Sequence, residues 1–251
     1  MDKIDINEMD KIDINEMDKI DINEIDINEI DINEIDINEN NIKSNKTNKT
    51  NKSNKSNKTN KSNKSKNIVC IGDSLTNRGL VSRNGWIRLF KQIYSKSQII
   101  NYGYEGYNSN MLNSMITRLI PNSNLFLATI LLGTNDCYSS FFVNPEDYKI
   151  NILDIIHHIY QLNPNCIVLL ITPPVCKLNT YIFEYVEMIY QIGKEHSFVK
   201  IVDLHSGADA ILLEDLDDGV HFSDVGQKKV FNNIQKTISK YYEFDHLKHL
   251  L

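Results

Sequence analysis

From residue 68 onward, short apolar runs alternate with segments whose apolar residues recur at helical spacing. The short runs are rich in Ile, Val and Leu, and several are nearly continuous, which is typical of strands covered on both faces. Strands alternating with helices indicate βαβ units, right-handed crossovers and a parallel sheet. The predicted strands are 68–71, 98–102, 125–132, 166–171 and 198–204.

The helical segments carry their own start signals and apolar faces. The clearest helix follows Asn144, which suits the N-cap, while Pro145 suits the first turn and the two acids after it complement the helix dipole. Isoleucines at 152, 155, 156 and 159 then form one face. The other predicted helices are 85–95, 109–120, 181–195 and 223–241.

The first 67 residues have a different character. Residues 1–39 repeat MDKIDINE and then IDINE, and a period of five collects the isoleucines on one side of neither a helix nor a strand. Residues 40–67 repeat Asn-Lys-Ser/Thr. We therefore predict a low-complexity disordered tail over 1–67, followed by one folded domain over 68–251.

Charge and composition exclude several classes of function for the domain. Residues 68–251 hold 15 basic and 18 acidic residues, so no strong positive charge favours a nucleic-acid partner. No apolar run approaches a membrane span, and no charged segment followed by an apolar one opens the chain. We expect a cytoplasmic protein whose four cysteines, at 70, 137, 166 and 176, are reduced thiols without metal-binding spacing.

A serine stands where the first predicted strand breaks off, in the stretch IVCIGDSLTNRG. Ser74 can be a turn residue, a helix cap or a nucleophile. In parallel sheets ligands gather at the carboxyl ends of strands, so the position of Ser74 favours a catalytic role. A serine nucleophile requires a base, an orienting group for that base and donors for the developing oxyanion.

A base and its orienting group are available in the stretch DGVHFS. Asp218 and His221 are three residues apart before the last helix, so one tight turn can bring the carboxylate to the near imidazole nitrogen. The far nitrogen could then face Ser74. An exposed loop pair is the alternative reading, and His205, beside the fifth strand, is the rival base.

Donors for an oxyanion are available after two other strands. Asn135 follows the third strand in the stretch GTND, and its side-chain amide could point at the site. Gly106 follows the second strand, where a glycine lets its backbone N–H approach closely. Each residue could equally be part of an ordinary turn.

Taken together and in order, these segments resemble the SGNH or GDSL hydrolases. The resemblance rests on GDSLT at 72–76, NYGYEGYNS at 101–109, GTND at 133–136 and DGVHFS at 218–223, and it extends over 68 to about 240. Within that family the chain is most similar to the isoamyl acetate-hydrolysing esterase group, on GW at 85–86, EGYNS and LLITPPVC. The Gly-x-Ser-x-Gly elbow of α/β-hydrolases is absent from the sequence.

The resemblance implies a fold and roles for particular residues. The fold would be a three-layer α/β/α sandwich with a five-stranded flavodoxin-like sheet. Ser74 would be the nucleophile, His221 the general base and Asp218 its orienting partner. The oxyanion hole would consist of the Ser74 and Gly106 N–H groups and the Asn135 amide. No metal or cofactor would be needed.

The predicted function is hydrolysis of small carboxylic esters with short acyl groups, such as acetates. Substrate contacts are expected from Tyr107, Thr134 and Pro173, although tyrosines in such loops also serve as packing. Alternatives on the same fold are a carbohydrate O-acetyl esterase, a thioesterase or a lysophospholipase. A non-catalytic binding module is a further alternative, but it leaves the matched set of strand-end residues unexplained.

Overall fold

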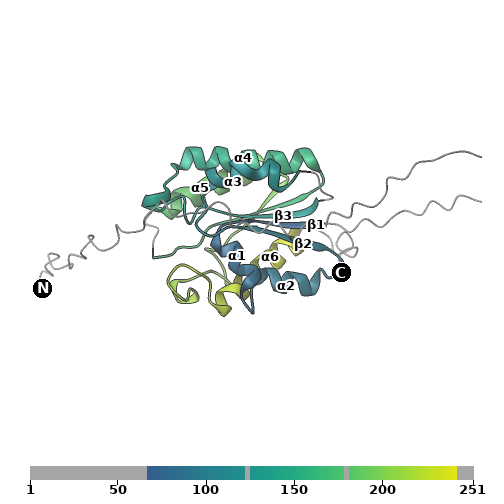
Figure 1. The fold of residues 1–251 in the computed structure, drawn as a ribbon. Coiled ribbons are helices and arrows are strands. Elements are labelled where there is room, and N and C mark those ends of the chain that lie inside the picture. Colours follow the sequence, from purple (N-terminus) through teal and green to yellow (C-terminus); the bar gives the residue numbers. More distant parts are fainter. Residues whose placement is uncertain (1–66, 122–124, 178–180, 242–251) are drawn as a thin grey trace, which may run out of the picture. The chain divides into compact units, whose positions relative to one another are not determined.

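A computed structural model describes residues 67–121, 125–177 and 181–241 of the 251-residue chain. Its centre is one parallel sheet in the order β2-β1-β3-β4-β5, which is the flavodoxin-like order of doubly wound sheets (Figure 1). The strands are β1 (Asn67–Gly72), β2 (Gln98–Gly103), β3 (Leu125–Leu131), β4 (Ile167–Ile171) and β5 (Val199–Val202). Because β1 lies between β2 and β3, the loops after these three strands meet at one edge.

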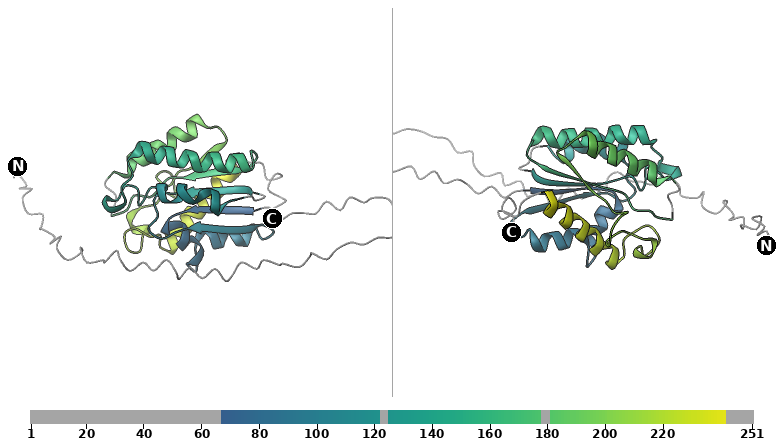
Figure 2. Two further views of the ribbon diagram at one scale, coloured as in Figure 1. Left: turned by 45° about the horizontal axis from the view of Figure 1, so that its top comes forward. Right: turned by 180° about the vertical axis from the view of Figure 1, so that it is seen from behind.

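Helices cover both faces of the sheet (Figures 1 and 2). One layer consists of α1 (Ser74–Val81), α2 (Trp86–Ile93) and α6 (Asp224–Tyr241). The opposite layer consists of α3 (Ser109–Leu119), α4 (Pro145–Leu162) and α5 (Ile182–Glu195). Two short 3-10 turns, η2 (Ser139–Phe141) and η3 (Leu213–Asp215), lie in the loops. The predicted three-layer α/β/α sandwich is confirmed.

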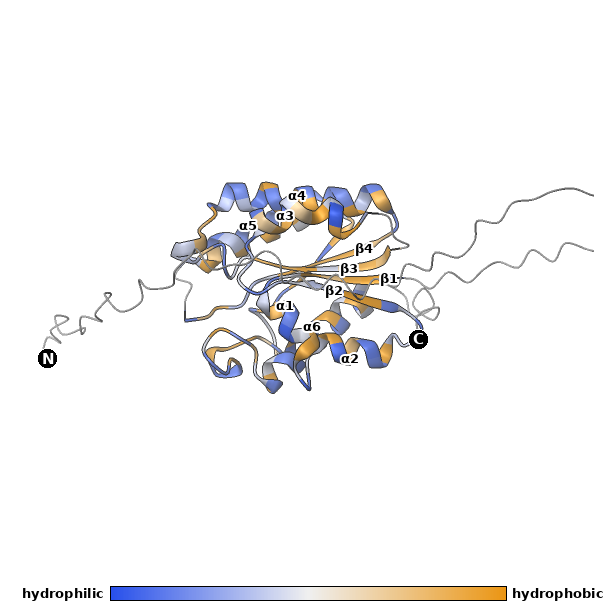
Figure 3. Ribbon diagram, in the orientation of Figure 1, coloured by the Kyte–Doolittle hydropathy of each residue, from blue (hydrophilic) through white to orange (hydrophobic). Residues whose placement is uncertain are grey.

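Each face of the sheet has its own apolar core. The isoleucines at 152, 155, 156 and 159 of α4 are fully buried in the core beneath α3, α4 and α5. On the other face Trp86 and Phe90 of α2 are fully buried and meet edge-to-face. Figure 3 shows the same pattern, with apolar strands between helices whose polar residues face outward. Burial on both faces explains why strand β4 is apolar throughout.

The predicted strands and helices are present, and their ends agree with the predictions to within two residues. The start of α4 agrees with the prediction, because Asn144 caps the helix through a bond to the Asp147 N–H and Pro145 opens it. One helix, α1, was not predicted. Its eight residues include Gly79 and three small polar residues with modest helix propensity, so tertiary packing rather than propensity maintains it.

Parts of the sequence-based predictions lie outside the described residues. This holds for the proposed disordered tail over 1–67 except Asn67, which is the first residue of β1, and the division into tail and domain stays a prediction. In the described part of the chain, no helix is both long and apolar enough to cross a membrane. All four cysteines are buried.

Candidate active site

Ser74 is the first residue of α1, immediately beyond the carboxyl end of β1. It is not the helix cap, because Asp73 takes that role and accepts a hydrogen bond from the Leu75 N–H at 2.9 Å. The strand can turn so sharply into the helix because Gly103 of β2 lets α1 approach closely. A Cβ at position 103 would lie 2.3 Å from the Asn77 nitrogen. The serine is thereby fixed at the switch point of the sheet.

Asp218 and His221 share one tight turn, as the spacing predicted. Leu216 and Phe222 form an isolated antiparallel bridge across the base of this turn, and the Asp217 N–H donates to the His221 carbonyl at 2.9 Å. Inside the turn, Asp218 Oδ1 accepts the backbone N–H groups of Val220 and His221 at 2.9 and 2.8 Å. These two backbone hydrogen bonds therefore orient the Asp218 carboxylate independently of its contact with the imidazole.

An ion pair between helix α6 and the residue Asp215, which precedes this turn, stabilises the turn. Lys229 of α6 lies 2.6 Å from Asp215, whose side chain is only 4% exposed. Asp215 also accepts the Leu212 N–H, and its carbonyl accepts the Ser223 N–H at 2.8 Å. Helix α6 is thus tied to both ends of the segment that presents His221.

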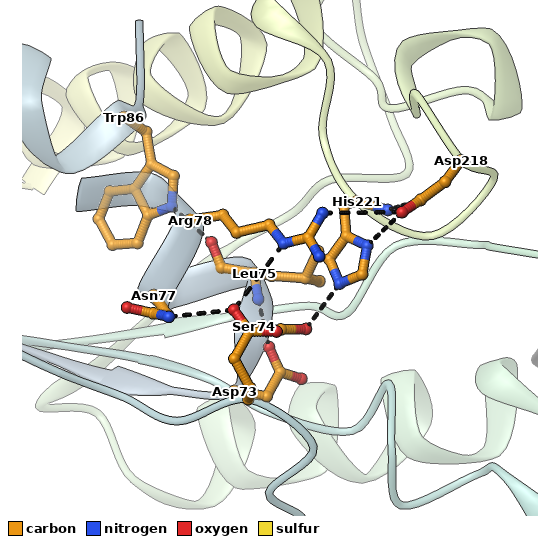
Figure 4. Close-up of polar contacts among 9 residues, drawn as sticks. Asp73, Ser74, Leu75, Asn77, Arg78, Trp86, Asp218 and His221 are labelled. Carbon is orange, nitrogen blue, oxygen red and sulfur yellow. Dashed lines mark hydrogen bonds and ion pairs between the residues drawn. The ribbon is translucent and has the colours of Figure 1, made fainter. Parts of the chain in front are cut away.

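Ser74, His221 and Asp218 form one hydrogen-bonded chain (Figure 4). His221 Nε2 lies 3.0 Å from Ser74 Oγ, and His221 Nδ1 lies 2.6 Å from Asp218 Oδ2. Burial alone would raise the pKa of Asp218, but hydrogen bonds from the His221 backbone, its imidazole and the Val220 N–H hold it well below its usual range. The ionised carboxylate can only accept, so the proton belongs on Nδ1 and the Ser74 hydroxyl donates to Nε2.

The two predicted donor residues lie in the loops after β2 and β3, the strands on either side of β1. Gly106 has a φ of +73°, and a Cβ there would meet no atom within 4 Å. A left-handed backbone, rather than close approach, is therefore what favours glycine in the free protein. The Asn135 amide donates one hydrogen bond to the Tyr107 carbonyl at 2.8 Å, which joins the two loops and leaves its second N–H available.

The predicted substrate-contact residues differ in their surroundings. Tyr107 is half-buried, and its ring stacks on Tyr104 with centroids 5.0 Å apart. Thr134 is buried, and its hydroxyl has no hydrogen-bond partner among the described residues. Pro173 is buried, and its carbonyl lies 2.9 Å from Nε2 of His205. The rival histidine is thus bonded to backbone, whereas His221 meets Ser74.

Two buried carboxyl groups close to the site were not singled out from the sequence. Burial raises the pKa of Asp73 from 3.8 to about 8, and the nearby Asp136 acts in the same direction. Burial likewise raises the pKa of Asp136 to about 6, although bonds from Ser109 oppose it. In the part of the chain that the structure describes, one oxygen of each carboxyl group is buried without a hydrogen-bond partner. Protonation is the ordinary response of a carboxyl group in such surroundings.

The raised pKa of Asp73 predicts a pH-dependent stability. Between about pH 4 and pH 8 the folded protein keeps a proton that the unfolded chain releases, so the free energy of unfolding falls as pH rises. Asp73→Asn keeps the capping acceptor and is expected to flatten this decline. Urea midpoints at pH 5 and pH 8 measure the effect, with the exposed Asp154→Asn as the matched control. Equal declines in the Asp73 variant and the wild type would refute the prediction.

Two charged residues at the mouth of the site were also missed. Arg78 lies 3.6 Å from Asp218 Oδ2 and 3.8 Å from Glu105 Oε1. The sequence could point to Arg78 only if a helix beginning at Ser74 had been predicted, because Arg78 then lies one turn after Ser74 on the same helical face. Within the described residues, no cluster of three or more His, Cys, Asp or Glu could hold a metal ion.

A hydroxyl, an imidazole and a carboxylate in one hydrogen-bonded chain, at the carboxyl edge of a parallel sheet, have the geometry expected of a serine-type hydrolase. Residues 70–229 match the GDSL-like lipase/acylhydrolase family. The chain belongs to this family, and it is a carboxylic ester hydrolase.

Individual relatives agree with this assignment. The chain is 26% identical over 209 residues to the isoamyl acetate-hydrolyzing esterase 1 homolog of Mus musculus, covering 69% of this chain and 81% of the relative. It is 22% identical over 188 residues to the isoamyl acetate-hydrolyzing esterase of Schizosaccharomyces pombe, covering 69% and 75%. The crystal structure of the lipase/acylhydrolase from Enterococcus faecalis superposes with a TM-score of 0.59 at 22% identity, over 70% of this chain and 96% of that one. That likeness supports the fold.

Proposed function

We propose that this protein hydrolyses small carboxylic esters with short acyl groups, of the acetate type, through a covalent acyl-enzyme. The observation that carries the proposal is the 3.0 Å contact between Ser74 Oγ and His221 Nε2, with Asp218 on the other imidazole nitrogen. The acetate preference is suggested by the isoamyl acetate-hydrolyzing relatives of mouse and fission yeast.

In the first half-reaction Ser74 Oγ attacks the carbonyl carbon of the ester, and its proton passes to His221 Nε2. The carbonyl π electrons move onto oxygen, and this oxyanion would be held by the Ser74 and Gly106 N–H groups and the free N–H of Asn135. When the intermediate collapses, the bond to the leaving oxygen breaks. Nε2 returns the proton to that oxygen, and the alcohol departs.

Water completes the cycle. His221 Nε2 accepts a proton from water, and the resulting hydroxide attacks the acyl carbon. The second tetrahedral intermediate expels Ser74 Oγ, which recovers its proton from the imidazole, and the carboxylic acid leaves. The ionised Asp218 carboxylate stabilises the imidazolium in both halves, because it accepts the Nδ1–H throughout.

A fluorophosphonate probe tests the proposed nucleophile. We expect one covalent adduct on the full chain, located at Ser74 by peptide mapping and absent from Ser74→Ala. Acyl preference is measured with p-nitrophenyl acetate, butyrate and octanoate, alongside acetylated sugars, an acyl thioester and a lysophospholipid. The proposal expects the highest kcat/KM on acetate. Folded protein without label would favour a binding module, and a maximum on octanoate or on another substrate class would overturn the acetate assignment.

A further inference from the structure

Arg78 forms ion pairs with two carboxylates, those of Asp218 (Figure 4) and Glu105. It follows Ser74 by one turn of α1, so both side chains lie on the same helical face. Its Nη1 is 3.6 Å from Asp218 Oδ2, and its Nε is 3.8 Å from Glu105 Oε1. The guanidinium therefore connects the turn that carries His221 with the loop that carries Gly106.

We propose that Arg78 is a positioning residue for ester hydrolysis: its guanidinium, balanced by Glu105, sets how strongly the Asp218 carboxylate supports positive charge on His221. The inference rests on the function proposed above. It predicts that Arg78 weakens and Glu105 strengthens the hold of His221 on the proton that it takes from Ser74.

Asp218 receives its hydrogen bond from His221, whereas Arg78 acts on it through charge alone. Asp218 Oδ2 accepts the His221 Nδ1–H at 2.6 Å, whereas Arg78 remains at 3.6 Å from the same oxygen. At that separation the guanidinium attracts the carboxylate without replacing the imidazole as its hydrogen-bond donor. A positive charge beside Asp218 disfavours a second positive charge on His221.

Glu105 offsets this effect from the other side of the guanidinium. Its Oε1 also accepts a hydrogen bond from the Asn77 amide at 3.0 Å, so α1 holds the glutamate through two successive residues. With Glu105 in place, the Arg78 charge is shared between two carboxylates. Without it, the charge would act on Asp218 alone.

The surrounding charged groups are the same in each comparison. Lys177 lies in the loop after β4, and its side-chain carbons pack against Gly219. Its backbone N–H donates to the Gly219 carbonyl at 2.9 Å. Asp217 precedes Asp218 and is exposed, and the buried Asp73 precedes Ser74. None of these is altered by changing Arg78 or Glu105, so differences between variants report the two mouth charges.

A contribution to stability does not explain this arrangement. The Arg78, Asp218 and Glu105 side chains are 40%, 51% and 52% exposed. Ion pairs this exposed contribute little to folding, but their charges still act on a titrating neighbour. The sensitive readout is therefore the pH dependence of catalysis.

The test measures the acid limb of kcat/KM on p-nitrophenyl acetate for the full chain. We expect Arg78→Gln to move the limb to higher pH by about 0.3 to 0.7 unit and Glu105→Gln to move it to lower pH by about 0.1 to 0.4 unit. Arg78→Lys keeps the charge and should leave the limb near its wild-type position. Arg118→Gln, in the last turn of α3, is the matched control. Both shifts should shrink in 1 M salt.

A second measurement does not depend on turnover. The imidazole signals of His221, assigned with His221→Gln, are followed by NMR across the same pH range. Opposite displacements of this titration in the two glutamine variants support the inference. Displacements in one direction, or none, overturn it, whether or not the wild type hydrolyses esters. Loss of ester hydrolysis in the wild type itself would instead remove the proposed function.

Discussion

Ser74→Ala is expected to lower kcat for ester hydrolysis by about 10⁴- to 10⁶-fold. The reason is chemical, because the substitution removes the hydroxyl oxygen that we propose forms the acyl-enzyme, and it leaves His221 without a proton to accept. The residual rate would come from binding and from the remaining oxyanion donors. Turnover of p-nitrophenyl acetate at saturating substrate measures the loss, with active-site titration to exclude contaminating esterase.

The structure offers a matched control for this experiment. Ser82 is the C-cap residue at the opposite end of the same helix, α1, and it contributes to the helix end through its backbone N–H. Ser82→Ala therefore removes an equal hydroxyl without touching His221, and we expect near-normal turnover. Both variants should keep the wild-type thermal midpoint within a few degrees. A Ser74→Ala enzyme with a tenth or more of wild-type kcat would refute the nucleophile assignment.

The sheet and its two helical layers could be predicted because their signals are local and strong. Strands β1, β3 and β4 are short apolar runs, and α4 shows both its cap and its isoleucine face in the sequence. Helix α1 escaped prediction because its stabilisation is tertiary. Asp73 caps it, and Trp86 packs against Gly79 so closely that a Cβ there would lie 2.4 Å from the indole nitrogen.

From the sequence we predicted the hydrogen-bonded chain of Ser74, His221 and Asp218, but not the charged and buried groups around it. Ser74, Asn135 and the Asp218–His221 turn each follow a strand or precede a helix, which sequence spacing reveals. The Arg78 contacts depend on the helical phase of an unpredicted helix, so no spacing rule could supply them. The burial of Asp73 and Asp136 was equally hidden, because aspartates in Gly-Asp-Ser and Thr-Asn-Asp stretches look like ordinary turn residues.

The second large effect is expected from Asp218→Asn, which should lower kcat/KM by about 10³- to 10⁴-fold. Asp218 Oδ1 is held by two backbone N–H groups, so the asparagine oxygen would keep that place and the amide nitrogen would replace Oδ2. An N–H would then face His221 Nδ1, which could only accept. The imidazole proton would move to Nε2, where it prevents the nitrogen from receiving the Ser74 proton.

Asp217→Asn is the control for this prediction. Asp217 is exposed and holds the turn through its backbone N–H, which donates to the His221 carbonyl, so the variant should keep wild-type kcat/KM. Because the Asp218 side chain is 51% exposed, water can partly solvate a wrongly placed amide, and a loss near the lower end of the range is the natural result. Retention of more than a tenth of the activity would mean that the backbone of the turn orients His221 without the carboxylate. In that case Arg78 could not influence the imidazole through the Asp218 carboxylate. The same measurement therefore tests the role of Asp218 and the role proposed for Arg78.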